Sequence, residues 1–346
     1  MKPTLRIIFP GLFTTIQDAG RYGFQRLGVS LGGALDPVAL RAANLLAGNP
    51  AYAGAIEALY VGPTFAVEAD DARLAFAGAD AAIELLASAD AVHGERIAPM
   101  QSVRVRRGQV VRIGSLKKGA SLYIAVEGGF DIEPVLGSVS TDCRGKMGGW
   151  KGRTLAANDL LPLCRALATE RDECRIEGLD LSPPQRFRTV LGPQNDYFSE
   201  AVIEGFFASE YTVSAESNRM GLRLDGPPLQ HRHGFNILSD AIATGSIQVP
   251  GGGQPIVLLA DHQTTGGYPK IATVISADLP AMGRLPIGAK IRFAPTTVDE
   301  AARARRALNA TLESLPGKLV RIAPPAAITT QLVECNLISG VHDAAA

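Results

Sequence analysis

The sequence has few cysteines, few histidines and no long apolar run, and each shortage excludes a class of protein. Its four cysteines include no Cys-x-x-Cys pair, and none of its five histidines stands at metal-ligand spacing beside a cysteine. These patterns argue against a zinc site and a disulfide framework. No run approaches the ~18 apolar residues of a membrane span, and the first residues lack the apolar core of a signal peptide. We therefore expect a soluble cytoplasmic protein with no metal site and no membrane contact.

An excess of charge of either sign is also lacking. The 346 residues include 34 basic and 34 acidic side chains, so the formal net charge is zero. Proteins that bind nucleic acid usually carry a basic surplus. Arg104, Arg106 and Arg107 do cluster, but they alternate with Val103 and Val105, which is typical of the solvent face of a strand. We expect no nucleic-acid partner.

Three motifs that carry well-known chemistry are missing. There is no Gly-x-x-x-x-Gly-Lys-Ser/Thr phosphate loop and no Gly-x-Ser-x-Gly nucleophile turn. Gly145-Lys146-Met147 lacks both the upstream glycine and the hydroxyl residue of a phosphate loop. The Ala-Met-Lys-Met sequence of a biotin-attachment site is absent as well. This chain is therefore not expected to carry biotin or to bind ATP by the usual loop.

What the sequence does contain is a series of short β-rich runs bounded by Gly, Pro and Asn. Several alternate apolar with polar residues, as half-buried antiparallel strands do. The sequence therefore predicts a mostly β fold built from sandwiches or barrels. The expected strands cover residues 73–77, 103–106, 109–113, 122–126, 187–191, 221–224, 255–259 and 290–293.

Helices are few. Asp36 and Pro37 predict the start of one, because Asp caps helix N-termini and Pro suits the first helical position. Gly48 stands just past its expected end. Two further helices are expected: one from Thr297, which opens a Thr-x-x-Glu capping box, to about Leu312, and a short one over 198–206.

A weak internal sequence repeat indicates two related halves. In each half an apolar strand leads to a glycine pair with an aromatic residue, and a Gly-Arg turn then leads to a second strand. The polar stretch 174–186 is the natural boundary between them. We predict an N-terminal β domain over 1–175, a C-terminal β domain over 186–295 that carries the candidate site, and a helix and tail over 296–346.

The densest polar cluster runs from Asp261 to Lys270 and reads Asp-His-Gln-Thr-Thr-Gly-Gly-Tyr-Pro-Lys. It follows an apolar run, so its polar groups are expected at the end of a strand. An acid, an imidazole, an amide and two hydroxyls lie there together, and the paired glycines let the backbone approach a ligand. The alternative is a polar turn that satisfies its own hydrogen bonds. We favour function, since loops on rigid scaffolds carry binding and catalytic residues.

Two segments before this cluster could contribute to the same site. Gln248 lies between Ile247 and Val249 and would face away from them on a strand, where it could supply an amide. A plain hairpin loop is as good an interpretation of that segment. Asn218 and Arg219 precede a strand, and Arg219 could hold a carboxylate with two N–H groups or simply brace a turn. These two interpretations are equally open.

A polar, Gly-rich segment also lies near the N-terminus, over residues 14–23. It contains a pair of hydroxyls, a carboxylate and an arginine. We slightly favour a structural turn here, in which Asp18 pairs with Arg21, over a second functional site.

A series of motifs follows in order across residues 7–293, from Pro10-Gly11-Leu12-Phe13-Thr14-Thr15-Ile16-Gln17-Asp18 onwards. The strongest are Ser217-Asn218-Arg219-Met220-Gly221, Gly245-Ser246-Ile247-Gln248-Val249-Pro250 and the stretch from Asp261 to Pro280. Together they resemble the carboxyltransferase-like family. This family includes the C subunit of bacterial 5-oxoprolinase, KipA-type antagonist subunits, allophanate hydrolase subunit 2 and the matching domain of urea carboxylase.

The resemblance implies a pair of cyclophilin-like β-barrel domains with a few short helices. It also implies two partners, a KipI-type B subunit and an A subunit, with which 5-oxoproline is opened to glutamate at the expense of ATP. In biotin-linked relatives the same fold transfers a carboxyl group from carboxybiotin to urea or a guanidine. Because this chain lacks both motifs, ATP is expected on or shared with a partner, and biotin only if another chain supplies it.

A small amide substrate suggests roles for the candidate residues. Opening an amide requires donors for a developing oxyanion and a group that transfers protons. We assign Asp261 and His262 to proton transfer, and Arg219 to the carboxylate of 5-oxoproline. The remaining expected substrate-binding residues are Asn218, Gln248, Gln263, Thr264, Gly266, Gly267 and Tyr268.

The main expectation is therefore the C subunit of a 5-oxoprolinase-type complex, an amidohydrolase of a cyclic amide that requires its partner subunits. Two alternatives stay open. The chain could be the carboxyltransferase component of a biotin-dependent urea or guanidine carboxylase, or a KipA-type regulatory binding module.

Overall fold

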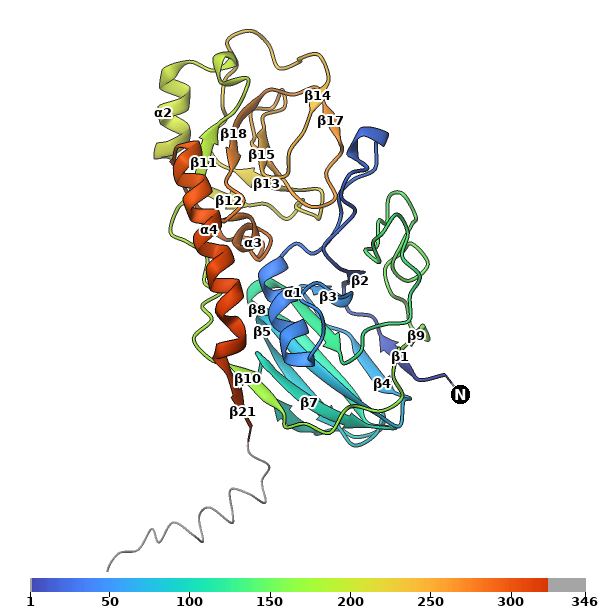
Figure 1. Cartoon of the computed structure of the whole chain (residues 1–346). Helices are drawn as coiled ribbons and strands as arrows, with labels where there is room; N and C mark the ends of the chain where they lie inside the picture. The colour runs from blue at the N-terminus through green and yellow to red at the C-terminus, as the bar shows by residue number, and fades with distance from the viewer. Residues whose placement is uncertain (1, 323–346) are drawn as a thin grey trace, which may run out of the picture.

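The computed structural model describes residues 2–322 and shows a mostly β protein with two large sheets and few helices (Figure 1). This confirms the predicted fold class. Within the described residues, no helix is both long enough and apolar enough to span a membrane.

The first sheet has eleven strands, and its two longest, β5 and β8, pair antiparallel from Leu74 opposite Val126 to Leu86 opposite Val110. Their apolar side chains belong to a buried core with Leu5 of the first strand. The strands are β1 (Thr4–Phe9), β2 (Phe13–Gln17), β3 (Ala55–Leu59), β4 (Thr64–Val67), β5 (Asp71–Leu86), β6 (Glu95–Ile97), β7 (Gln101–Arg106), β8 (Val110–Val126), β9 (Leu160–Pro162), β10 (Cys174–Ile176) and β21 (Leu319–Arg321).

The second sheet has eight strands, and the chain itself joins its two ends. The sheet runs in the order β19-β12-β13-β16-β15-β18-β11-β20, yet only Arg292 separates β19 from β20. Joining both edges in this way curls the sheet into a nearly closed barrel. Its strands are β11 (Phe187–Leu191), β12 (Tyr211–Val213), β13 (Gly221–Asp225), β15 (Ser246–Gln248), β16 (Ile256–Leu258), β18 (Lys270–Val274), β19 (Lys290–Ile291) and β20 (Phe293–Pro295), beside a small pair formed by β14 (Asp240–Ala241) and β17 (Thr265–Gly266).

Two strand predictions need correction. The runs 109–113 and 122–126 are one strand, β8, because the polar stretch between them continues the pairing with β5, as at Asp80 opposite Lys117. The run 290–293 is instead divided between β19 and β20, which pair with opposite edges of the barrel. The pattern of polar and apolar residues does not show that a strand continues past the core. Nor does it show that the pairing strand changes within four residues.

The helix predictions are confirmed. Helix α1 (Pro37–Ala47) begins at Asp36, whose carboxylate accepts from the backbone N–H groups of Val38 and Ala39. Helix α4 (Val298–Ser314) begins with the predicted Thr297–Glu300 capping box. The others are α2 (Glu200–Ala208), α3 (Leu279–Met282) and the short 3-10 turns η1 (Gln25–Leu27), η2 (Asn195–Tyr197) and η3 (Leu315–Lys318).

Helix α4 returns the chain from the second sheet to the first, and Figure 1 shows it running beside both. Leu312 and Leu315 are buried against Val38 of α1. Beyond them, β21 pairs with β10 and so completes the edge of the first sheet. Of the predicted helix and tail, residues 323–346 lie outside the described residues.

Candidate functional site

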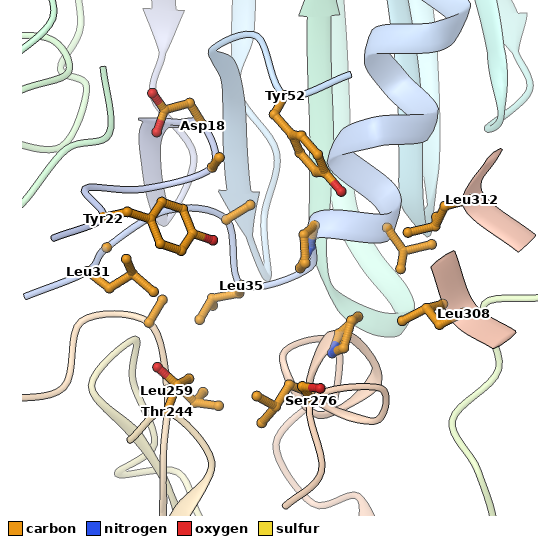
Figure 2. A pocket seen from close by; sticks show the side chains of 18 of the residues that line it. Asp18, Tyr22, Leu31, Leu35, Tyr52, Thr244, Leu259, Ser276, Leu308 and Leu312 are labelled. Carbon is orange, nitrogen blue, oxygen red and sulfur yellow. The ribbon is translucent and has the colours of Figure 1, made fainter. Parts of the chain in front are cut away.

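A cavity of about 590 Å³ lies between the two sheets and under α4 (Figure 2). Its size is typical of pockets for small ligands, and most of its wall is apolar. One side comes from the segment that links β2 to α1, the facing side from the second barrel, and the end from α4. The lining residues are Asp18, Ala19, Tyr22, Leu31, Gly32, Ala34, Leu35, Pro37, Val38, Tyr52, Thr244, Leu259, Ala260, Ser276, Leu279, Pro280, Arg305, Leu308 and Leu312.

The predicted segment Asp261–Tyr268 begins directly behind this wall. Leu259 and Ala260 line the cavity, and the polar residues follow them as the chain leaves β16 for β17. No residue from 261 to 268 belongs to the lining itself. The segment therefore lies behind one wall of the cavity rather than in it.

Arg219 and Asp261, which were predicted separately, form one ion pair. The Nε and Nη2 atoms of Arg219 donate to the Asp261 carboxylate at 2.8 and 2.9 Å. Nη1 donates to Glu57 on β3, and Nη2 also donates to the carbonyl of Gly33 at 2.7 Å. Burial acts to lower the pKa of Arg219, but the charges of Asp261 and Glu57 outweigh it and raise that pKa above its ordinary value. These bonds join the two halves. They also occupy the guanidinium of Arg219, which was expected to hold a substrate carboxylate.

The same ion pair extends into a buried network within the first half. The carboxylate of Glu57 accepts from the Tyr123 hydroxyl at 2.6 Å. That hydroxyl accepts from the backbone N–H of Asp36 at 2.8 Å. The Asp36 carboxylate in turn pairs with Nη1 of Arg284 at 2.7 Å, which returns the network to the second half. Buried charges are stable only when paired and hydrogen-bonded, so the network fixes how the halves meet.

His262 points away from solvent, with 3% of its surface exposed. Its Nδ1 lies 2.5 Å from the carbonyl oxygen of Gln263, and its Nε2 lies 3.0 Å from Oγ1 of Thr244. Burial lowers the pKa of the imidazole, partly offset by the Gln263 carbonyl and the charge of Asp261. Because Thr244 lines the cavity, its side chain lies between the imidazole and the cavity.

Two predicted amide residues meet on the other side of the segment. Gln263 Nε2 lies 3.4 Å from Oε1 of Gln248, whose side chain is buried. Among the described residues, Gln248 Nε2 has no hydrogen-bond partner. A Cβ at Gly266 would stand only 2.6 Å from that nitrogen, so this position requires glycine for close approach.

The remaining predicted residues hold the loop or lie at its surface. Asn218 Oδ1 accepts from the backbone N–H of Met220 at 2.8 Å, which braces the turn before β13. The carbonyls of Thr264 and Gly267 accept from backbone N–H groups of the neighbouring 237–242 loop. Tyr268 is 39% exposed.

The N-terminal polar segment forms a structural turn that also borders the cavity through Asp18, Ala19 and Tyr22, but the turn is not the one expected. Asp18 accepts from the hydroxyls of Ser138 at 2.6 Å and Ser140 at 2.5 Å. Arg21 donates through Nε to the carbonyl of Val135 at 3.2 Å. The predicted Asp18–Arg21 ion pair is therefore wrong: each residue binds the same distant loop instead of the other.

The sequence did not identify several residues whose contacts lie far along the chain. Thr244 stands one position before the Gly245–Pro250 motif, and no local pattern marks it as a site residue. Glu57 and Arg284 occur in apolar contexts where no local pattern indicates a partner. Lys270 lies at the end of the predicted cluster, and its buried side chain pairs with Asp240 at 2.8 Å. Each of these residues is recognised only by a contact with a residue far along the chain.

A family model described as carboxyltransferase domain, subdomain A and B, matches residues 27–295. The chain belongs to this family. It is 39% identical over 316 residues to the C subunit of 5-oxoprolinase from Escherichia coli (strain K12), covering 91% of this chain and 98% of that relative. The Haemophilus influenzae protein of the same name is 38% identical, covering 84% and 91%. Urea amidolyase of Saccharomyces cerevisiae is 31% identical over 92% of this chain, but that match spans only 18% of the yeast protein.

Two solved structures have the same fold. The K. lactis urea amidolyase matches with a TM-score of 0.81 and 26% identity over 94% of this chain. The structure of TTHA0988 matches with a TM-score of 0.75 and 35% identity over 85% of this chain. The chain spans about a fifth of the first protein's length and 56% of the second's. The resemblance inferred from the sequence is confirmed at the level of the family.

Proposed function

We propose that this protein is the C subunit of a 5-oxoprolinase-type complex, which opens 5-oxoproline to glutamate with ATP. The main support is the share of each relative's length that this chain matches. The chain matches two proteins named as the C subunit of 5-oxoprolinase over 98% and 91% of their length, whereas it matches less than a fifth of the yeast urea amidolyase. Such a name implies a complex of several subunits, and we propose a KipI-type B subunit and an A subunit as the partners.

In this proposal the cavity between the halves receives the cyclic amide. Its apolar wall suits the ring, and the hydroxyls of Thr244 and Ser276 offer hydrogen bonds to the amide. Among the described residues, Arg305 is the one cationic side chain in the lining, and it replaces Arg219 as the proposed partner of the substrate carboxylate. Arg219 and Asp261 then act as positioning residues that hold the wall, while His262 provides proton transfer through its neighbour.

The composition of the cavity bears on where ATP binds. Triphosphates require several cationic or N–H donors, and the side chains of the described lining include one cation, Arg305, and one carboxylate, Asp18. We therefore propose that ATP is bound on or shared with a partner subunit. Biotin has a place in the reaction only if another chain supplies it.

The test uses the chain purified together with an A subunit and a B subunit from the same organism. ATP hydrolysis and glutamate release are measured with 5-oxoproline, with urea and with neither. We expect hydrolysis that depends on 5-oxoproline and on all three subunits. Hydrolysis unaffected by 5-oxoproline would exclude the proposed function.

A second candidate is carboxyl transfer to urea or a guanidine. The yeast urea amidolyase supports it, since 92% of this chain aligns with that protein. ATP hydrolysis that depends on urea, bicarbonate and a biotin-carrying partner would favour this candidate instead.

A further inference from the structure

A hydroxyl–imidazole pair stands at the wall of the cavity. Figure 2 shows Thr244 in this wall. His262 does not belong to the lining and contacts Thr244 from behind it. Oγ1 of Thr244 lies 3.0 Å from Nε2 of His262. On the far side of the ring, Nδ1 lies 2.5 Å from the carbonyl oxygen of Gln263. A carbonyl oxygen can only accept, so Nδ1 carries the proton and Nε2 presents a lone pair. Thr244 must then donate its hydroxyl proton to His262.

This arrangement has the three parts that activate a hydroxyl in enzymes. They are an oxygen that faces the ligand, a base within hydrogen-bond reach, and a third group that orients the base. Ser276 also lines the cavity, but within the described residues its hydroxyl contacts no histidine. Thr244 is therefore distinguished from Ser276, the other aliphatic hydroxyl of the lining, by the imidazole behind it.

We propose that Thr244 is a catalytic residue that relays protons between the amide substrate in the cavity and His262. This inference rests on the proposed amide-opening function. As water adds to the amide carbonyl carbon, its proton passes to Oγ of Thr244 while the proton of Thr244 passes to Nε2 of His262. When the C–N bond breaks, the proton returns by the same path to the leaving nitrogen. Both residues end the cycle as they began it.

The surroundings of His262 suit this role. Burial lowers the pKa of the imidazole and so keeps it neutral at neutral pH, which is the form that can accept a proton. The imidazolium formed during the cycle is stabilised by the Gln263 carbonyl at Nδ1–H and by the charge of Asp261. Asp261 is the charged side chain that acts on the ring, and its bidentate pair with Arg219 moderates that charge.

The first test compares Thr244→Val, Thr244→Ser and the control Thr212→Val in the assembled three-subunit complex. Thr212 lies on β12, outside the cavity lining, so its variant controls for a Thr-to-Val change in the second barrel that leaves the cavity wall intact. Removing one proton-transfer group costs roughly 100-fold or more in kcat, and we expect this for Thr244→Val with KM little changed. Thr244→Ser should recover most of the rate. A Thr244→Val rate within about threefold of wild type would overturn the relay.

The pH profile separates a relay from a merely structural role. Wild-type kcat should fall at acid pH as His262 becomes protonated, and the residual rate of Thr244→Val should lack this acid limb. An unchanged acid limb in Thr244→Val would contradict the proposal even if that variant were slow.

The inference can be tested even if the proposed function fails. A wild-type complex that uses urea rather than 5-oxoproline rejects that function, and the same variants are then compared with urea. If neither is turned over, nitrogen-15 NMR of the histidine rings decides, with His262→Gln used to assign the signal. A Nε2 signal that moves in Thr244→Val and shifts on adding 5-oxoproline supports the relay. A signal unchanged by either overturns it.

Discussion

Arg219 shows how a tertiary contact redirects the chemistry of a residue. Its planar fork suits a carboxylate, and the sequence left open whether that carboxylate belongs to a substrate or to the protein. The structure shows the fork on Asp261, with Glu57 of the other half beside it. The residue type indicated that the partner is a carboxylate. Which carboxylate it is depended on how the two halves meet.

Replacing this arginine should be costly. Arg219→Ala leaves Asp261 and Glu57 without their cation, and breaking a buried ion pair costs about 3–5 kcal/mol. The control is Arg223→Ala, whose exposed side chain lies 3.6 Å from Glu216 and should cost less than about 1 kcal/mol. Urea denaturation of the isolated chain measures both. Equal losses in the two variants would show that the buried network contributes no special stability.

The lowered pKa of His262 predicts how the stability of the folded protein depends on pH. Its pKa is lowered by burial in the folded protein, so the unfolded chain takes up a proton on this ring at a higher pH than the folded one. The contribution to stability is therefore complete above the unfolded pKa of about 6.5 and is lost as pH falls through the folded pKa. The free energy of unfolding should decrease more between pH 7.5 and pH 5.5 in wild type than in His262→Gln.

A surface histidine provides the comparison for this measurement. His93 is exposed in the loop before β6, and His93→Gln should keep the wild-type dependence on pH. If His262→Gln and His93→Gln lose equal amounts of stability on acidification, His262 is not the group responsible.

At the scale of elements, the short strand β17 sets the geometry of the predicted loop. It pairs with β14 and places Gly266 directly against the buried amide of Gln248. The sequence identified this glycine as a point of close approach, and the close partner is a side chain of the same barrel.

Gly266→Ala tests this packing. Its Cβ would stand 2.6 Å from Nε2 of Gln248 and 2.7 Å from Cδ1 of Ile242. Because Gln248 is buried, its amide would have to shift within the packed interior, and we expect an overpacking loss of about 1–3 kcal/mol in unfolding free energy. Gly252→Ala is the matched control, since a Cβ there meets nothing within 4 Å. Similar stabilities for the two variants would exclude a rigid contact at Gly266.

For the whole molecule, three kinds of connection join the halves within residues 2–322. The Arg219–Glu57 and Asp36–Arg284 pairs cross between them, α4 packs on α1, and β21 returns to the first sheet. Buried contacts of this kind make separate unfolding of either half unfavourable, because each would expose charges and apolar surface of the other.

We therefore expect one cooperative unfolding transition. Trp150 is the only tryptophan of the chain and packs against the core of the first half, so its fluorescence reports that half. Far-ultraviolet circular dichroism reports both sheets. The two signals should share one midpoint in urea, and a circular-dichroism transition with a second step absent from the fluorescence would show that the halves unfold independently.

Local chemistry determined much of this protein from sequence alone. Alternation of apolar residues indicated a mostly β fold, and the caps at Asp36 and Thr297 placed two helices, because both signals arise within a few residues. Ordered motifs identified the family, and a polar cluster pointed to the wall of the cavity. Tertiary structure alone decided that Arg219 pairs with Asp261, that Thr244 stands between His262 and the cavity, and that α4 closes the end of that cavity. Those outcomes join residues far apart in the chain, and only packing between the halves determines which side chains meet.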